Sequence, residues 1–178
     1  MDEQIRIPFS EFLAPVTKTN ALRILESHDV TFDTVEYAVD DCATPRHAVV
    51  SLDAVSVALK IGAEPESVFK TLVARGDKTG VCVFVIPGPF ELNLKKAAAA
   101  SGNKSVELIH LRELTPLTGY VRGGCSPIGM KKPYPTWIDE TAQLFEHIYA
   151  SAGQRGLQMF LMPADLLRVV GAEWADLV

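Results

Sequence analysis

The sequence predicts one mixed α/β domain of the α+β type, with a twisted, mixed, largely antiparallel sheet surrounded by helices. The chain has 178 residues, which is enough for one domain with a substantial core. Hydrophobic residues make up 48% of it, a fraction typical of a globular protein. Strand-like and helix-like segments follow one another without a regular βαβ order. We expect an N-terminal extension over residues 1–16, interrupted by prolines, and a single domain over residues 17–178.

The first half of the domain is expected to mix helices with strands. Helices are indicated by capping residues followed by apolar residues on one face, and strands by β-branched and aromatic runs. In order, the predicted elements are a helix over 19–28 capped by Thr17 or Thr19, a strand over 30–39, a loop over 40–51, a helix over 52–62 capped by Ser51 and ended by Gly62, and a hairpin of strands 67–75 and 80–88.

The second half of the domain is expected to form shorter helices and strands. In order, they are an alanine-rich helix over 92–102, a strand over 104–110, a helical turn over 111–116 closed by Pro116, strands over 136–139, 145–151 and 157–162, and a last helix over 163–172 that begins at Pro163. Short antiparallel pairs should therefore dominate the sheet.

Charge and composition exclude several classes of protein. A net charge of −5 disfavours broad binding to a phosphate backbone, but it permits a small basic pocket for one end of a nucleic acid. No apolar run reaches the roughly 18 residues that a membrane span needs, and the start of the chain does not resemble a secretory signal. Three cysteines at irregular spacing indicate reduced thiols and a cytoplasmic location. We expect no metal site and no cofactor.

The segment "TGYVRGGCSPIGMKK" concentrates glycines and cations. Gly123 and Gly124 can adopt backbone angles that other residues avoid, and they let a ligand approach exposed N–H groups. Those donors could cradle a phosphate or stabilise an oxyanion, although a tight turn without a ligand fits the pattern equally well. Lys131, Lys132 and Arg122 would give the loop a positive rim.

Two further residues leave alternatives open. Cys125 could be a nucleophile if a histidine lowered the pKa of its thiol, but a lone cysteine is more often a small buried side chain. Lys70 interrupts an apolar strand, so it faces either solvent at a sheet edge or a cleft that uses its charge.

Three segments in this order, "VFKTLV", "TGYVRGGCSPIGMKK" and "IYASAGQRGLQM", resemble the YbaK/EbsC group, the stand-alone relatives of the editing domain inserted in bacterial prolyl-tRNA synthetase. The resemblance runs from about Thr17 to the C-terminus. It implies an aminoacyl-tRNA deacylase that hydrolyses mischarged tRNA in trans, with Cys-tRNA(Pro) as the expected substrate and prolyl-tRNA synthetase as a possible partner. The alternative is a module that binds aminoacyl-tRNA or a synthetase without hydrolysis.

The resemblance also implies roles for individual residues. Lys70 matches the family's essential lysine, and Gly123 matches the loop glycine whose amide faces the ester, with Gly124 beside it. The expected substrate-binding residues are Tyr37, Thr71, Ser126, Ser151, Gln158 and Lys131. Gln158 stands where cysteine-editing members have an aspartate. For a cysteinyl substrate, the resemblance implies that the substrate's own thiol attacks its ester, which leaves Cys125 as a packing residue.

Overall fold

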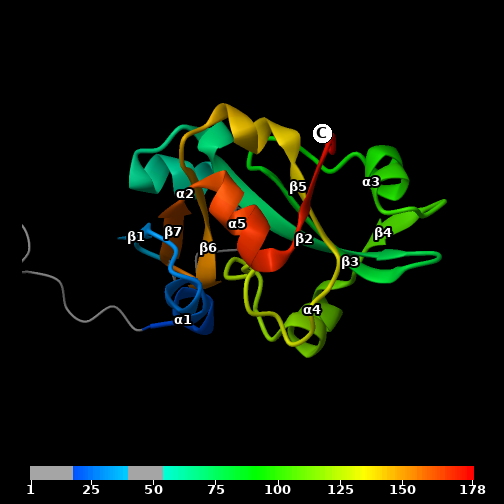
Figure 1. Cartoon of the computed structure of the whole chain (residues 1–178), viewed down its shortest axis with the longest axis horizontal. Coiled ribbons are helices and arrows are strands. Elements are labelled where there is room, and N and C mark those ends of the chain that lie inside the picture. Colours follow the sequence, from blue (N-terminus) through cyan, green and yellow to red (C-terminus); the bar gives the residue numbers. More distant parts are fainter. Residues whose placement is uncertain (1–17, 40–53) are drawn as a thin grey trace, which may run out of the picture.

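A computed structural model of the chain describes residues 18–39 and 54–178 (Figure 1). The helices are α1 (Asn20–Ser27), α2 (Ala54–Ile61), α3 (Leu94–Ala100), α4 (Leu111–Thr118) and α5 (Pro163–Val170), with 3₁₀ helices η2 (Pro65–Ser67) and η3 (Glu140–Leu144). The strands are β1 (Phe32–Glu36), β2 (Val68–Gly76), β3 (Gly80–Pro87), β4 (Val106–Leu108), β5 (Thr136–Asp139), β6 (Ile148–Gln154), β7 (Leu157–Leu161) and β8 (Glu173–Ala175).

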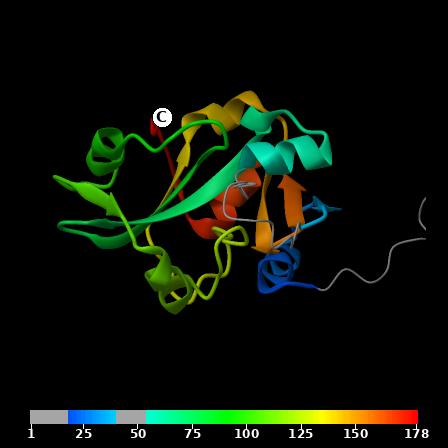
Figure 2. The same ribbon diagram turned by 180° about the vertical axis from the view of Figure 1, so that it is seen from behind.

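These strands form one mixed sheet, so the predicted fold class is confirmed. The strand order is β1-β7-β6-β2-β3-β5-β8, and β4 pairs with β2 outside this path. Within the described ranges, four pairings are antiparallel and three are parallel. The long β2–β3 hairpin runs from the half of the molecule that holds β1, β6 and β7 to the half that holds α3 and β4 (Figures 1 and 2). It therefore extends through both halves of the molecule, in the middle of the strand order.

The largest apolar core joins α1 and α5 to the inner strands. Ala21, Leu22 and Leu25 of α1 are buried in it, on the helix face that the sequence predicts, and the hydroxyl of Thr19 accepts a hydrogen bond from the Leu22 amide as the expected cap. Leu166 on α5 is also fully buried. A smaller core cluster underlies α3, on the far part of the hairpin.

Several boundaries depart from the sequence-based expectations. The turn predicted to close at Pro116 continues as α4 to Thr118 and ends at Gly119, whose φ is +85°. Pro116 has no N–H, so the helix loses one hydrogen bond, to the carbonyl four residues earlier. At the end of the helix, the Thr118 hydroxyl donates a 2.7 Å hydrogen bond to the carbonyl of Leu114. Strand β8 and both 3₁₀ helices were not expected. The predicted extension over 1–16, the loop over 40–51 and the Ser51 cap lie outside the described residues.

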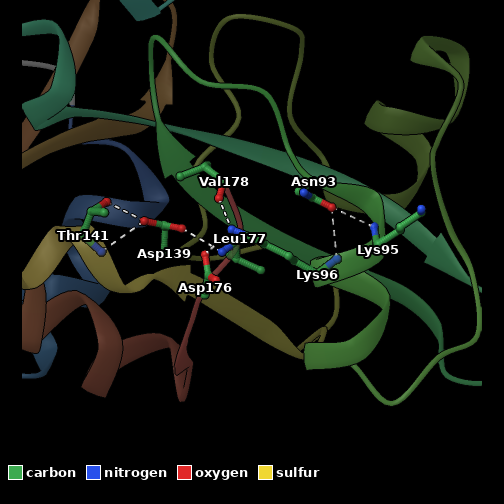
Figure 3. Close-up of polar contacts among 8 residues, drawn as sticks. All are labelled: Asn93, Lys95, Lys96, Asp139, Thr141, Asp176, Leu177 and Val178. Carbon is green, nitrogen blue, oxygen red and sulfur yellow. Dashed lines mark hydrogen bonds and ion pairs between the residues drawn. The ribbon is translucent and has the colours of Figure 1, made fainter.

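The C-terminal segment is fixed by polar contacts around one buried carboxylate (Figure 3). Asp139 is 1% exposed, and it accepts hydrogen bonds from the amides of Leu177 (2.9 Å) and Thr141 (3.0 Å). Lys96 pairs with Asp176 at 2.7 Å on the far side of the segment. These contacts hold the end of the chain against β5 and α3.

Strand β2 has a gap in its pairing, and this gap positions the functional site. Its ladder with β6 covers Val68 and Phe69, and its ladder with β4 begins at Ala74. Within the described residues, 70–72 have no strand partner on that edge. The Ile109 amide donates to the Val73 carbonyl at 3.2 Å, so Val73 faces the β4 side. Because backbone polar groups alternate along a strand, the N–H and C=O of Thr71 face the same open edge.

Candidate active site

A cavity of about 260 Å³ lies at this open edge of β2. Six of the nine residues expected from the sequence line it, namely Tyr37, Lys70, Thr71, Gly123, Ser151 and Gln158. They come from the end of β1, from β2, from the glycine loop and from the β6–β7 hairpin. Apolar side chains complete the wall: Ala54, Val57, Val68, Phe69 and Leu72. Segments far apart in the sequence therefore meet in one small, partly apolar chamber.

Lys70 lies in the cleft rather than at a solvent edge. Its side chain is half-buried, and its Nζ donates a hydrogen bond to the carbonyl oxygen of Gly88 at 2.9 Å. Gly88 follows β3, and its amide donates to the Val68 carbonyl at 2.8 Å. The backbone that follows β3 therefore holds the ammonium group at the cavity wall, where it presents a fixed positive charge.

Gly123 occupies the third position of a tight turn. Its φ is +83°, while the amide of Gly124 donates to the carbonyl of Val121 at 3.0 Å. A positive φ at the third residue but not the second defines a type II turn, which favours glycine at that position. A type II turn differs from a type I turn in the orientation of its central peptide, which here is the peptide between Arg122 and Gly123.

This peptide is anchored from outside the cavity. The Nε of Arg155, in the β6–β7 turn, donates a 2.7 Å hydrogen bond to the carbonyl of Arg122. The C=O and N–H of a trans peptide point in opposite directions, so the amide of Gly123 points away from Arg155. No described residue accepts a hydrogen bond from this amide. The loop residue that lines the cavity therefore carries an N–H donor that has no partner in the described part of the chain.

The β6–β7 turn also contacts the other parts of the site. A Cβ on Gly124 would lie 3.0 Å from the amide nitrogen of Arg155, so the glycine loop and the hairpin touch through their backbones. On the other side, the Tyr37 amide donates to the Gly156 carbonyl at 2.9 Å. The same turn thus positions both the glycine loop and the end of β1.

Two buried polar atoms of the cavity lining have no hydrogen-bond partner among the described residues. They are the Oγ1 of Thr71 and the Oε1 of Gln158, whose side chain is only 4% exposed. Buried polar groups are nearly always satisfied, so both atoms point to a ligand or to water in the cavity. Gln158 pairs with Ser151 across the hairpin, which places both expected residues on one wall.

Three expected residues do not line this cavity. Gly124 uses its amide in the turn, Ser126 is fully buried and accepts a hydrogen bond from the Ile128 amide, and the Lys131 ammonium lies 3.3 Å from the Pro116 carbonyl at the end of α4. Gly124 and Ser126 shape the loop, whereas Lys131 lies at its periphery. Their predicted roles toward a substrate remain predictions.

Cys125 lines the cavity but is a poor nucleophile. Its side chain is 8% exposed, and burial raises the pKa of the thiol to about 12, against a smaller lowering by the Thr118 side chain. The nucleophile is the thiolate, so this thiol is inert at neutral pH. His28, His110 and His147, the histidines in the described ranges, are absent from the lining.

Arg155 and the carbonyl of Gly88 are the contributors that sequence reasoning missed. The only available signal for Arg155 was its place in the tight "GQRG" turn, which does not indicate what the side chain contacts. Among the described residues, no three His, Cys, Asp or Glu side chains gather to hold a metal ion. No helix in residues 18–39 and 54–178 is long and apolar enough to cross a membrane.

Comparisons with known proteins identify the family of this chain. The model of the aminoacyl-tRNA editing domain family matches residues 49–169. The chain is 48% identical over 160 residues to the "Putative Cys-tRNA(Pro)/Cys-tRNA(Cys) deacylase EbsC" of Enterococcus faecalis, covering 90% of this chain and 93% of that protein.

Solved structures show the same fold. A "putative trans-editing enzyme for prolyl tRNA synthetase" superposes with a TM-score of 0.73 at 27% identity, over 90% of this chain and 98% of that one. A hypothetical protein superposes with a TM-score of 0.74 at 22% identity, over 87% and 96%. The resemblance seen in the sequence is confirmed, and the chain belongs to the family of aminoacyl-tRNA editing domains.

Proposed function

We propose that this protein hydrolyses, in trans, the ester bond of mischarged aminoacyl-tRNA, with Cys-tRNA(Pro) as its substrate. The observation that carries the proposal is that the Lys70 ammonium and the unpartnered Gly123 amide share one cavity. The relative from Enterococcus faecalis, at 48% identity, supports the choice of cysteine. The acceptor end of the tRNA is the proposed partner, and the cytoplasm is the proposed location.

Ester hydrolysis develops negative charge on the carbonyl oxygen. In the proposed complex, the amide of Gly123 donates to this oxyanion, because the turn has already oriented its N–H. The Lys70 ammonium stabilises negative charge on the ester or on the adjacent phosphate. Both groups are fixed by backbone contacts before the substrate arrives, so little reorganisation accompanies the reaction.

The amino-acid part of the substrate would lie against the hairpin wall. The Oε1 of Gln158, which has no partner among the described residues, can accept a hydrogen bond from the α-ammonium group, and the small, partly apolar cavity favours a short side chain. Glutamine supplies no charge where an aspartate would, so the hydrogen bond alone orients the amine. This wall would therefore control which amino acid is removed.

For a cysteinyl substrate, the attacking group is the substrate's own thiol. Its sulfur attacks the ester carbonyl, the bond to the ribose oxygen breaks, and the proton passes to the departing hydroxyl. Water then opens the resulting thiolactone to cysteine. This route agrees with the raised pKa of the Cys125 thiol.

A deacylation assay over Cys-, Ala-, Ser- and Pro-tRNA(Pro) tests the proposal. We expect rapid release of cysteine and retention of correctly charged proline. If Cys-tRNA(Pro) binds saturably while its ester persists, the protein is a binding module and not a deacylase. Adding prolyl-tRNA synthetase to the same assay tests whether that enzyme is a working partner.

A further inference from the structure

The side chain of Tyr120 closes the glycine loop from outside the cavity. Its phenol hydroxyl donates a 2.6 Å hydrogen bond to the carbonyl of Ile128, so the two ends of the segment that contains Gly123 are joined directly. Burial raises the pKa of this phenol to about 12, so at neutral pH the hydroxyl keeps the proton that it donates. Tyr120 does not line the cavity, and it therefore acts on the loop without touching a bound substrate.

The backbone of Tyr120 is fixed by α4. The hydroxyl of Thr115 donates to the carbonyl of Tyr120 at 2.8 Å, and the amide of Tyr120 donates to the hydroxyl of Thr118 at 3.0 Å. Both polar groups of this residue's main chain are thus held by one helix. The loop starts from a fixed point, and the aromatic ring projects from it in a fixed direction.

The ring of Tyr120 also lies against β6. A Cβ on Gly153 would be 3.0 Å from the Cε1 of Tyr120, so the ring contacts the backbone of that glycine directly. Gly153 has a φ of +90° and lies where the pairing of β6 with β7 shifts its register, between Ser151 and Gln154. We name residues 151–154 the β6 bulge. A larger residue at Gly153 would meet both the ring and an unfavourable backbone angle.

The β6 bulge carries a residue of the cavity wall. The amide of Gly153 donates to the Oγ of Ser151 at 3.3 Å, and Ser151 lines the cavity. From the direction of α1, the Thr19 hydroxyl donates to the carbonyl of Ala152 at 2.6 Å. Tyr120 therefore contacts both the loop that presents the Gly123 amide and the bulge that presents Ser151.

We infer that Tyr120 is a positioning residue, which sets the place of the Gly123 amide relative to Ser151. The inference rests on the proposed function, because it makes both groups act on one aminoacyl ester. A donor stabilises the oxyanion best when it does not have to move during the reaction. Loss of the phenol hydroxyl should therefore slow the chemical step, whereas substrate binding should stay the same because Tyr120 lies outside the cavity.

Two tyrosines of the same region allow a matched test. Tyr134 packs against the same small apolar cluster as Tyr120, and its hydroxyl donates to the carbonyl of Leu117 at 3.1 Å, but it does not contact the β6 bulge or line the cavity. Each Tyr→Phe substitution removes one hydroxyl bond to a carbonyl, so each should lower Tm by about 2–4 °C.

Only Tyr120→Phe should also change the reaction. We expect its kcat for Cys-tRNA(Pro) to fall about three- to tenfold at unchanged KM, the scale of one hydrogen bond, while Tyr134→Phe keeps the wild-type kcat. Equal kcat values for the two variants would overturn the inference, because the hydroxyl of Tyr120 would then contribute to stability alone. A rise in KM without a fall in kcat would overturn it as well.

NMR spectra of the protein without substrate separate this inference from the proposed function. Tyr120→Phe should shift the amide signals of Gly123 and Ser151, and Tyr134→Phe should leave both unchanged. If the wild type hydrolyses no Cys-tRNA(Pro) while these shifts appear, the deacylase assignment fails and the positioning contact stands. If the wild type is active but the two variants have equal kcat, the deacylase assignment stands and the positioning role fails.

Discussion

The Nε of Arg155 and the carbonyl oxygen of Arg122 are joined by a 2.7 Å hydrogen bond that links the β6–β7 turn to the glycine loop. This bond fixes the peptide whose N–H belongs to Gly123, so Arg155 acts on the proposed reaction by positioning that donor. It does so from the protein surface, since its side chain is exposed. A residue outside the cavity can therefore control the geometry of the oxyanion contact.

Arg155→Ala should lower kcat about tenfold or more, because one hydrogen bond to a charged group contributes about 1.5–3 kcal/mol and about 1.4 kcal/mol corresponds to a factor of ten. KM should change little, since Arg155 does not line the cavity. Arg155→Lys should restore part of kcat. Arg75→Ala is a matched control, because Arg75 is an exposed arginine whose partner is Glu113. Equal kcat for Arg155→Ala and the wild type would contradict the positioning role.

Gly123→Ala tests the role of the turn in the reaction, and Gly62→Ala is the matched control. Gly123 and Gly62 both have positive φ values, +83° and +69°, so alanine at either position should cost about 1–2 kcal/mol of unfolding free energy. A Cβ at Gly62 would meet nothing within 4 Å. Only Gly123→Ala should also reduce deacylation, on the order of 10², the scale for one displaced oxyanion donor. Chemical denaturation and single-turnover rates measure the two effects; equal rates for both variants would remove Gly123 from the reaction.

The buried thiol of Cys125 should make the free energy of unfolding depend on pH. Burial raises the pKa of its thiol from 9.0 to about 12, so between these values the unfolded chain releases a proton that the folded chain keeps. The contribution is complete below pH 9 and declines as the pH rises toward 12. In Cys125→Ala, the unfolding free energy should therefore fall less steeply above pH 9, by up to about 1.4 kcal/mol per pH unit. Identical slopes for the two proteins would show that this thiol ionises normally.

Asp139→Ala should destabilise the fold without affecting the cavity. The substitution leaves the buried amide of Leu177 and the half-buried amide of Thr141 without this acceptor, which should cost about 2–4 kcal/mol. Asp176→Ala, which removes an exposed ion pair with Lys96, should cost less than about 1 kcal/mol. Thermal unfolding measures both, and similar shifts in Tm would show that burial of Asp139 contributes nothing.

Most of the fold could be predicted from local sequence. Caps such as Thr19, the glycine ends of helices and the apolar hairpin runs are local signals, and the structure agrees with them. The helix end near Pro116 was predicted wrongly. The helix continues past the proline because the contacts of Gly119 and Thr118 offset one lost hydrogen bond, and the presence of a proline in the sequence does not reveal this. The three-residue strand β8 has too few residues for a periodic pattern, and it forms because β5 offers it a parallel partner.

The site was predictable where residue types are unusual. A lysine in an apolar strand and adjacent glycines in a loop directed attention to Lys70 and Gly123, and both line the cavity. The missing part concerns contacts between distant segments. The bond from Arg155 to Arg122 and the pairing gap of β2 depend on how the β6–β7 turn, the glycine loop and β4 meet, and no single segment encodes them.

The central claim is that a fixed cation and an oriented amide act on one ester, and Lys70→Ala tests it most directly. The measurement is the single-turnover rate of Cys-tRNA(Pro) deacylation, with Lys95→Ala as the control because Lys95 is exposed on α3. We predict that Lys70→Ala loses a factor on the order of 10² or more while Lys95→Ala stays near the wild-type rate. A Lys70→Ala protein that deacylates as fast as the wild type would contradict the account.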